Sequence, residues 1–368
     1  MMNRVLLFSI LIFFIASPLF AAQLRSQHDV ESENSALTLL HNTMAEMLQN
    51  EPRQGLEKIA DKFPLTNYTD FTINTEASIN TIKKPSTKIS DDEWQAFINT
   101  AFRADSENGE VNCKLVDLDG DGERDLIISS YSGGTGLFSY TGVLKRLGDK
   151  FADINNNAKN DAQVITGALY SENGRGANQW GQWVRINDLV YALWFNGEYD
   201  EDTFYLLRPF NTDNKIPSIT IYYQYEYDNS SIEAQDEGKQ LNPALNDHDK
   251  KQLIKSLNIK KYYFNKQKEE QEQEPICPVP AGTSSEDAAH YKTEIAGSYV
   301  TQPVAVLPVW LNGMCFIGSV ESYFGRGELM TISSPKDLKI FGTYSITGLR
   351  HIKSIKSGWK SREENIPL

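Results

Sequence analysis

The segment 117-DLDGDGERD-125 constrains the fold more than any other part of this chain. Four of its nine residues are aspartates: Asp117, Asp119, Asp121 and Asp125. Carboxylates this close in sequence repel one another unless a cation or hydrogen-bond donors compensate their charge. The loop is followed at once by the apolar run Leu126–Ile128, which is typical of a buried strand. The sequence therefore predicts a tight acidic loop that leads into a strand.

The spacing of the acidic residues fits a calcium ion. If Asp117 is position one, the other aspartates take positions three, five and nine, Gly122 takes position six, and Glu123 at position seven needs to offer only its backbone carbonyl. Calcium takes six to eight oxygens at roughly 2.3 to 2.6 Å, and glycine permits the sharp bend. The predicted site is structural, with ligands Asp117, Asp119, Asp121, Glu123 and Asp125. An acidic hairpin without metal is the alternative.

The run 116-VDLDGDGERDLII-128 resembles the strand–loop–strand calcium motif of FG-GAP and VCBS-type secreted proteins, which has the form DxDxDGxxDL. An EF-hand would need a bidentate glutamate at position twelve, where this chain has Ile128. The resemblance implies calcium binding and covers this motif only. FG-GAP proteins repeat the motif in propeller blades, whereas the nearest second copy here, 153-DINNNAKND-161, has Ala158 in place of the glycine. A propeller is therefore not predicted.

The first 22 residues have the pattern of a secretory signal. Arg4 precedes an apolar core, Val5–Ala16, and the small residues Ala21 and Ala22 offer a cleavage point. The apolar core is too short to cross roughly 30 Å of hydrocarbon at about 1.5 Å per residue, which disfavours the alternative of a membrane anchor. No later segment is apolar enough to span a membrane. We expect a periplasmic or secreted mature chain.

Charge and cysteine content narrow the possible partners and the redox chemistry. The formal net charge is −13, and loss of Arg4 with the signal makes it −14, which argues against nucleic acid or anionic lipid and suits a basic protein partner. An oxidising compartment allows two of the three cysteines to pair. Cys277 and Cys315 are the favoured pair because both lie in the C-terminal third, whereas Cys113 lies on an apolar segment typical of a buried thiol.

The hydrophobic pattern predicts an α+β fold. Helical spacing predicts two helices within 35–62, broken near Pro52, and a third at 91–104 with an apolar face that runs to Phe102. From Val111 onward, β-branched and aromatic residues punctuated by Gly, Asn and Asp predict a mostly antiparallel sheet. The predicted strands are 125–132, 137–147, 180–187, 189–197, 202–210, 218–227, 259–265, 299–311, 314–324 and 338–355, and further helices are predicted at 241–258 and 285–297.

The predicted division of the chain follows from these segments. The polar run 266–275 is the best domain boundary, although a solvated loop is an equal alternative. The predicted units are a signal peptide at 1–22, a helical region at 23–104, an antiparallel β domain with the calcium loop at 105–265, a linker at 266–276 and a smaller β-rich C-terminal domain at 277–368.

The absence of catalytic motifs favours a binding protein over an enzyme. The sequence has no nucleophile elbow, zinc-protease motif or cysteine–histidine signature. We expect a non-catalytic binding or inhibitory protein with a protein partner, such as an immunity protein against a toxin delivered to the envelope. The alternatives are a glycan hydrolase with a carboxylate pair in 198–202 or 226–237, and a glycan-binding surface protein. The aromatic side chains considered for such a surface are Trp180, Trp183, Trp194, Tyr222, Tyr223, Tyr225 and Tyr227.

Overall fold

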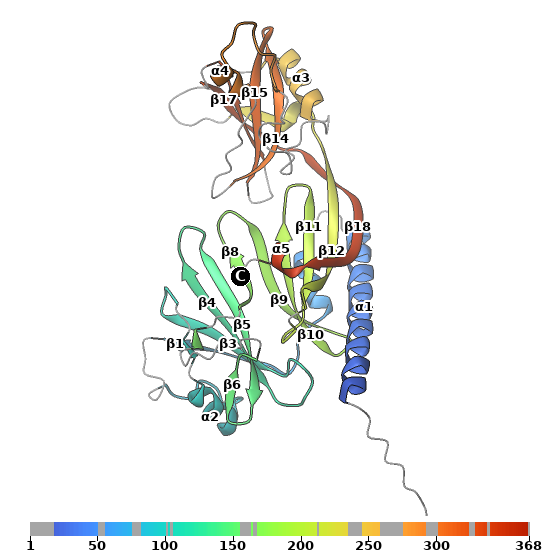
Figure 1. Cartoon of the computed structure of the whole chain (residues 1–368), viewed down its shortest axis with the longest axis vertical. Coiled ribbons are helices and arrows are strands. Elements are labelled where there is room, and N and C mark those ends of the chain that lie inside the picture. The colour runs from blue at the N-terminus through green and yellow to red at the C-terminus, as the bar shows by residue number, and fades with distance from the viewer. Residues whose placement is uncertain are drawn as a thin grey trace, which may run out of the picture.

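Three antiparallel sheets carry most of the structure, and the predicted α+β fold class is confirmed (Figure 1). The computed structural model of the chain describes residues 18–50, 56–75, 82–100, 102–103, 106–154, 163–164, 168–211, 213–234, 245–257, 275–291, 301–323, 328–336 and 339–366. Most of the predicted signal, residues 1–17, lies outside this part of the chain. Among the helices of the described residues, none is long and apolar enough to cross a bilayer.

The first sheet has strand order β1-β3-β4-β5-β6, and β8 also pairs with β5. Its strands are β1 (Thr69–Asn74), β3 (Glu110–Val116), β4 (Asp125–Gly133), β5 (Phe138–Leu147), β6 (Lys150–Ala152) and β8 (Ala168–Asn173). The side chains of β4 point alternately into two different cores, because successive residues of a strand face opposite sides of the sheet. Leu126 and Ile128 pack with Phe97 of helix α2 (Asp91–Asn99), whereas Ile127 packs on the opposite face against the second sheet.

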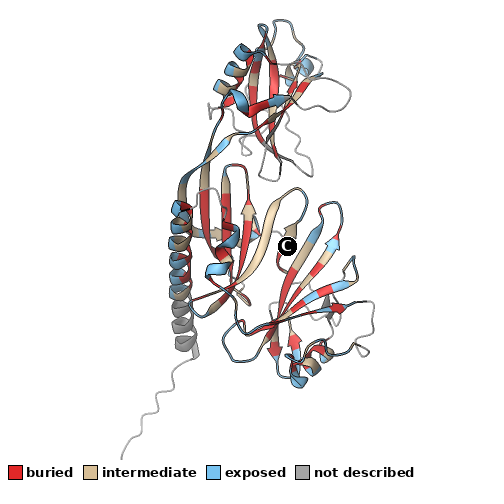
Figure 2. Ribbon diagram, turned by 180° about the vertical axis from the view of Figure 1, so that it is seen from behind, coloured by how far each residue is buried: buried red, intermediate tan, exposed pale blue. Residues whose placement is uncertain are grey.

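The second sheet has strand order β18-β12-β11-β10-β9. Its strands are β9 (Asn178–Ile186), β10 (Leu189–Gly197), β11 (Glu201–Leu207), β12 (Lys215–Glu226) and β18 (Leu349–Ser361). One face, with Leu193, packs against Leu40 and Met44 of helix α1 (Pro18–Asn50) and against the 3-10 helix η1 (Leu56–Lys62). The other face, with Trp194, packs against the first sheet. The layers are therefore α2, first sheet, second sheet and α1 (Figure 2).

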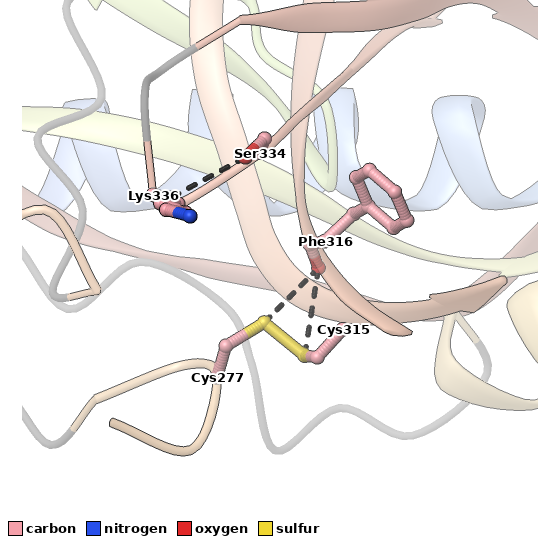
Figure 3. Close-up of a disulfide and its surroundings, with 5 residues drawn as sticks. All are labelled: Cys277, Cys315, Phe316, Ser334 and Lys336. Atoms are coloured by element: carbon pink, nitrogen blue, oxygen red, sulfur yellow. Dashed lines mark hydrogen bonds between the residues drawn. A yellow bond between two sulfur atoms is a disulfide. The ribbon is translucent and has the colours of Figure 1, made fainter. Parts of the chain in front are cut away.

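The third sheet has strand order β13-β17-β16-β15-β14 and a core of its own with helix α3 (Asp247–Leu257). Its strands are β13 (Ile232–Ala234), β14 (Thr301–Leu311), β15 (Met314–Tyr323), β16 (Glu328–Ser333) and β17 (Ile340–Ile346). A disulfide joins Cys277 to Cys315, the pair that the sequence favours, and anchors the segment that holds helix α4 (Ser285–Ala289) (Figure 3). Cys113 is a free thiol, and burial raises its pKa above the usual range.

Four further short elements lie within the described residues. Strands β2 (Phe102–Arg103) and β7 (Gln163–Val164) form a parallel pair, helix α5 (Arg362–Asn365) follows β18, and the 3-10 helix η3 (Asn229–Ser231) precedes β13. The predicted helix at 91–104 is too long, because it ends at Asn99. Thr100 has extended backbone angles there, its hydroxyl donates to the Ala96 carbonyl at 2.7 Å, and the same oxygen accepts the N–H of Phe151 at 2.8 Å.

Other predicted elements differ from the structure in length or lie outside it. The helix expected after Pro52 is the 3-10 helix η1, the helix at 285–297 is described only as α4, and the strand at 338–355 is two strands, β17 and β18. Strand β16 was not predicted. The predicted strand at 259–265 and residues 266–274 of the predicted linker lie outside the described residues, as does most of the Asn-rich segment 153–161.

Two strands belong to a different sheet from the one that the predicted domain division would give them. Strand β18 comes from the predicted C-terminal domain but joins the second sheet, and β13 comes from the predicted central domain but joins the third. Where the two sheets meet, Arg350 donates to both carboxylate oxygens of Asp202 at 3.0 and 3.1 Å, and the Tyr223 hydroxyl donates to the same carboxylate at 2.8 Å. Tyr199, from the β10–β11 turn, is buried in the core of the third sheet.

The packing of α1 on the second sheet is testable with two neighbouring leucines. Leu40 is completely buried, whereas Leu39 is 40% exposed on the same helix. We expect Leu40→Ala to lower the free energy of unfolding by about 2 to 5 kcal/mol, because it removes buried methyl groups and leaves a cavity. Leu39→Ala should cost less than about 1 kcal/mol. Urea unfolding of the two variants measures this difference, and equal losses would contradict the packing.

Candidate metal centre

The acidic loop is the tight connection between β3 and β4, and backbone hydrogen bonds shape it. The Asp117 carboxylate accepts the N–H groups of Gly120 at 2.7 Å and Gly122 at 3.1 Å. Both glycines have positive φ angles, +82° and +88°, which side chains with a Cβ rarely adopt. The loop therefore needs glycine at these two positions to bring its own N–H groups onto Asp117.

Asp125 is the buried end of the loop. Its side chain has no exposed surface, and its two oxygens accept the N–H groups of Leu118 at 3.1 Å and Arg146 at 2.8 Å. Burial raises the pKa of Asp125 to about 7, and the negative charge of Asp119 adds to this rise, whereas the two hydrogen bonds oppose it. An ionised Asp125 is therefore costly here unless a cation lies nearby.

Three of the predicted ligands converge in space. Carboxylate oxygens of Asp117, Asp119 and Asp125 all lie within 4.8 Å of one another. Two oxygens that bind one calcium ion at roughly 2.4 Å can be at most about 4.8 Å apart, so the three carboxylates meet a necessary condition for sharing one ion. Carboxylates on a protein surface also gather without an ion, so this proximity is a condition for the site and does not establish it.

Asp121 and Glu123, the other two predicted ligands, do not belong to this group of three. Asp121 accepts the N–H of Glu123 at 2.9 Å with one oxygen and a hydrogen bond from Lys145 at 2.8 Å with the other. The Glu123 side chain is exposed. The role expected of Glu123 uses its backbone carbonyl and does not involve this side chain.

Lys145 compensates the charge of the loop in this structure. Its ammonium group donates to Asp119 and to Asp121. Burial alone would lower the pKa of Lys145, but the two carboxylates raise it above its usual range, and Lys145 in turn lowers the pKa of Asp121. Sequence reasoning missed this residue because it lies on β5. Only the pairing of Leu126 with Leu144 places it beside Asp125.

Arg124 fixes the loop to helix α2. It donates to both carboxylate oxygens of Glu93, at 2.6 and 2.5 Å, and also to the Thr69 hydroxyl and the Lys88 carbonyl. Glu93 also caps its own helix, because it accepts the N–H of Ser90 at 2.8 Å. Burial alone would raise the pKa of Glu93, but the bonds from Arg124 and Ser90 hold it below its usual range.

The loop also contacts the second sheet. Leu118 is buried in the core between the first and second sheets, together with Ile216. Arg185 of β9 donates to the Asp117 carbonyl at 3.4 Å, and the Lys145 ammonium lies 5.8 Å from the ring centre of Phe210. The acidic loop therefore touches α2, the first sheet and the second sheet at one place.

The acidic clusters considered for catalysis have structural partners instead. Asp202 is held by Arg350, and its neighbour Glu201 projects from the opposite face of β11 toward Lys360, at 3.5 Å. In the second cluster, Asp228 caps η3 and Glu226 lies 3.3 Å from His351. Residues 235–237 of that cluster lie outside the described residues.

The aromatic side chains considered for a surface stripe are mostly packed within the protein. Trp194 has no exposed surface, and Trp180 stacks on Phe195 with ring centres 4.9 Å apart. Tyr225 and Tyr227 stack at the boundary of the third sheet, with ring centres 6.2 Å apart. The described structure therefore shows no continuous aromatic stripe among these residues.

The Arg124–Glu93 pair is testable by removing the arginine. Arg124→Met leaves the Glu93 carboxylate, which is only 12% exposed, without its counter-charge, so we expect a loss of about 3 kcal/mol in the free energy of unfolding. Lys84→Met breaks an ion pair whose partner Asp91 is 96% exposed, and should cost less than about 1 kcal/mol. Chemical denaturation compares the two variants, and equal stabilities would show that the loop does not depend on this contact.

Comparisons of the chain with protein-family models, with curated proteins and with solved structures find no match. The acidic loop is therefore characterised by its own geometry. Three carboxylates gather at the end of the β3–β4 hairpin, a lysine from β5 compensates their charge, and Arg124 ties the loop to α2.

Proposed function

We propose that the chain is an exported, non-catalytic binding or inhibitory protein whose two packed sheets are stapled by a calcium ion in the β3–β4 loop. The observation that carries the calcium part is the convergence of Asp117, Asp119 and Asp125 at a loop that touches both sheets. An ion bound there would compensate the buried charge of Asp125 and hold the loop against its neighbours.

A structural role for the ion is supported by the partners of the carboxylates. Asp117 and Asp125 accept backbone N–H groups, and Asp119 and Asp121 accept the ammonium of Lys145. Each carboxylate is thus already used to hold the loop in place. A reacting centre would need an adjacent acid or base that faces a substrate, and we assign none among these residues.

An inhibitory role, such as neutralising a toxin delivered to the cell envelope, is supported by the export pattern, the net charge of −13 and one exposed hairpin. At the β14–β15 turn, Trp310 is 46% exposed and Met314 is 60% exposed. The turn residues Asn312 and Gly313 both have positive φ, and Cys315 anchors the hairpin through its disulfide. A rigid hairpin with an exposed tryptophan suits a protein interface, because such side chains dominate binding energy and lose little freedom.

The hydrolase alternative has weaker support. A glycosidase pair requires two carboxyl groups about 5 to 10 Å apart that face one substrate. Glu201 and Asp202 project from opposite faces of β11, and Asp202 is bound by Arg350. These two residues therefore do not form such a pair.

The calcium proposal predicts a cation-dependent melting temperature. Calcium at about 100 times its dissociation constant should stabilise the protein by about 2.7 kcal/mol, or about 5 °C, relative to chelator. Asp119→Asn should abolish this response because it removes one of the three converging carboxylates. Glu123→Gln is the matched control and should respond like the parent, since only its backbone carbonyl is expected to bind. A parent protein that melts at the same temperature with calcium and with chelator would refute the site.

Lys145 gives a second prediction for the same loop. Lys145→Met removes the cation that holds Asp119 and Asp121, so in chelator the melting temperature should fall below that of the parent. Calcium should then raise it by more than it raises the parent, because the ion no longer has to displace an ammonium group. Calorimetry with and without calcium measures both effects. A variant that melts like the parent in chelator would show that Lys145 does not compensate the loop.

A further inference from the structure

Strand β18 forms one edge of the second sheet. It is 13 residues long, and β12 is its only partner among the described strands (Figure 1). The backbone N–H and C=O groups on the outer side of an edge strand point away from the sheet and can pair with a further strand. The outer side of β18 is therefore a template for another extended chain.

Three other sheet edges of the described structure carry features that hinder such pairing. The outer side of β9 is bridged by the segment at Phe63, whose carbonyl accepts the N–H of Arg185 at 3.1 Å. Strand β14 contains Pro303 and Pro308, which lack an N–H group, and β13 has only three residues. Strand β18 contains no proline and is the longest of the described strands. Of these four edges, β18 is the most open to pairing.

The two faces of the sheet at β18 are both accessible, and they differ in chemistry. No residue of β18 is buried. Ile352 and Trp359 lie on the face that packs against α1, and their side chains are 37% and 38% exposed. Lys356 lies on the opposite face and is exposed. A strand added to this edge would meet apolar side chains on one face and a lysine on the other.

Two lysines restrict which strand can pair at this edge. Lys353 lies at the bulge where the pairing of β18 with β12 shifts, and it is exposed like Lys356. Lys360 is paired with Glu201, whereas no carboxylate of the described residues forms an ion pair with Lys353 or Lys356. The Lys356 ammonium lies 5.3 Å from the ring centre of Tyr222. Like charges on neighbouring strands are destabilising, so these lysines disfavour a second copy of β18 and favour an acidic strand.

We propose that β18 binds an extended acidic segment of a partner protein by strand addition. In this mode of recognition, backbone hydrogen bonds to the sheet edge supply affinity and alternate side chains supply specificity. The segment would place apolar residues beside Ile352 and Trp359, and acidic residues near Lys353 and Lys356. The two faces of the edge thus select a sequence in which apolar and acidic residues alternate. This site is separate from the calcium loop and from the β14–β15 hairpin.

Fluorescence anisotropy with labelled synthetic peptides tests this inference. One probe is a short peptide of alternating valine and glutamate with blocked ends, and the other has lysine in place of glutamate. The parent protein, held in chelator, should bind the glutamate peptide at least tenfold more tightly than the lysine peptide, because only the glutamate peptide complements the charge of the edge.

Charge reversal locates the binding on β18. Lys353→Glu combined with Lys356→Glu should weaken binding of the glutamate peptide at least tenfold and should make the lysine peptide the preferred one. Lys58→Glu combined with Lys62→Glu is the matched control, because both lysines are exposed on η1 and the net charge changes equally. This control should bind like the parent. The melting temperatures of both variants, measured in the same buffer, verify that each one is folded.

A third peptide separates strand pairing from simple charge attraction. It is the glutamate peptide with a methyl group on every backbone nitrogen, which keeps the side chains and the charge but removes the backbone donors. We expect it to bind the parent at least tenfold more weakly than the unmethylated peptide, because it cannot donate hydrogen bonds to the carbonyl groups of β18.

Three results would overturn the inference. The first is a parent protein that binds the glutamate peptide no more tightly than the lysine peptide. The second is a folded charge-reversed variant of β18 that binds the glutamate peptide as the parent does. The third is a methylated peptide that binds as tightly as the unmethylated one. All these measurements are made without calcium, so the calcium proposal and this one can fail independently.

Discussion

The compensation of one buried carboxylate, that of Asp125, organises the body of this protein, by which we mean the first and second sheets with helices α1 and α2. Its position at the start of β4, with no exposed surface, places a negative charge where the first sheet meets the second. Two backbone N–H groups and the ammonium of Lys145 lie close enough to lower the cost of that charge. One N–H comes from Leu118 in the loop after β3, and the other N–H and the ammonium come from β5, so the charge is tolerated only when β3, β4 and β5 are correctly paired. The acidic loop therefore links local hydrogen bonding to the register of the whole first sheet.

The same loop relates the layers of the body to one another. Arg124 projects to one side and meets Glu93 at the start of α2, whereas Leu118 projects to the other side and enters the core between the sheets. Glu93 serves both its own helix as a cap and the loop as a counter-ion, so the start of α2 and the start of β4 are fixed together. Through these two contacts of Glu93, a short acidic segment is connected to layers that otherwise pack through their apolar cores.

Much of this arrangement is predictable from sequence, and the remainder depends on long-range pairing. Runs of β-branched and aromatic residues, punctuated by Gly, Asn and Asp, identify β4, β5 and β9–β12. The spacing of the aspartates identifies three side chains that do converge, Asp117, Asp119 and Asp125. The sequence near Lys145 and Glu93 does not reveal their contacts with the loop, because only sheet register and helix docking bring these two residues there. Likewise, the basic strand β18 reads as part of a C-terminal domain, although its hydrogen-bond partner is β12, more than a hundred residues earlier.

The return of β18 to the second sheet makes the third sheet an insertion. Strands β12 and β18 would be neighbours in a simple hairpin if residues 227–348, which hold the third sheet, were replaced by a short turn. Strand β18 is an edge of the second sheet, so this sheet is complete only after β18 has been synthesised. The pairing of β18 with β12 closes a long loop of the chain. A body of two sheets and two helices is thus topologically whole without the third sheet. The inserted unit is the part whose sequence can change, or be exchanged for another fold, while the body keeps its architecture.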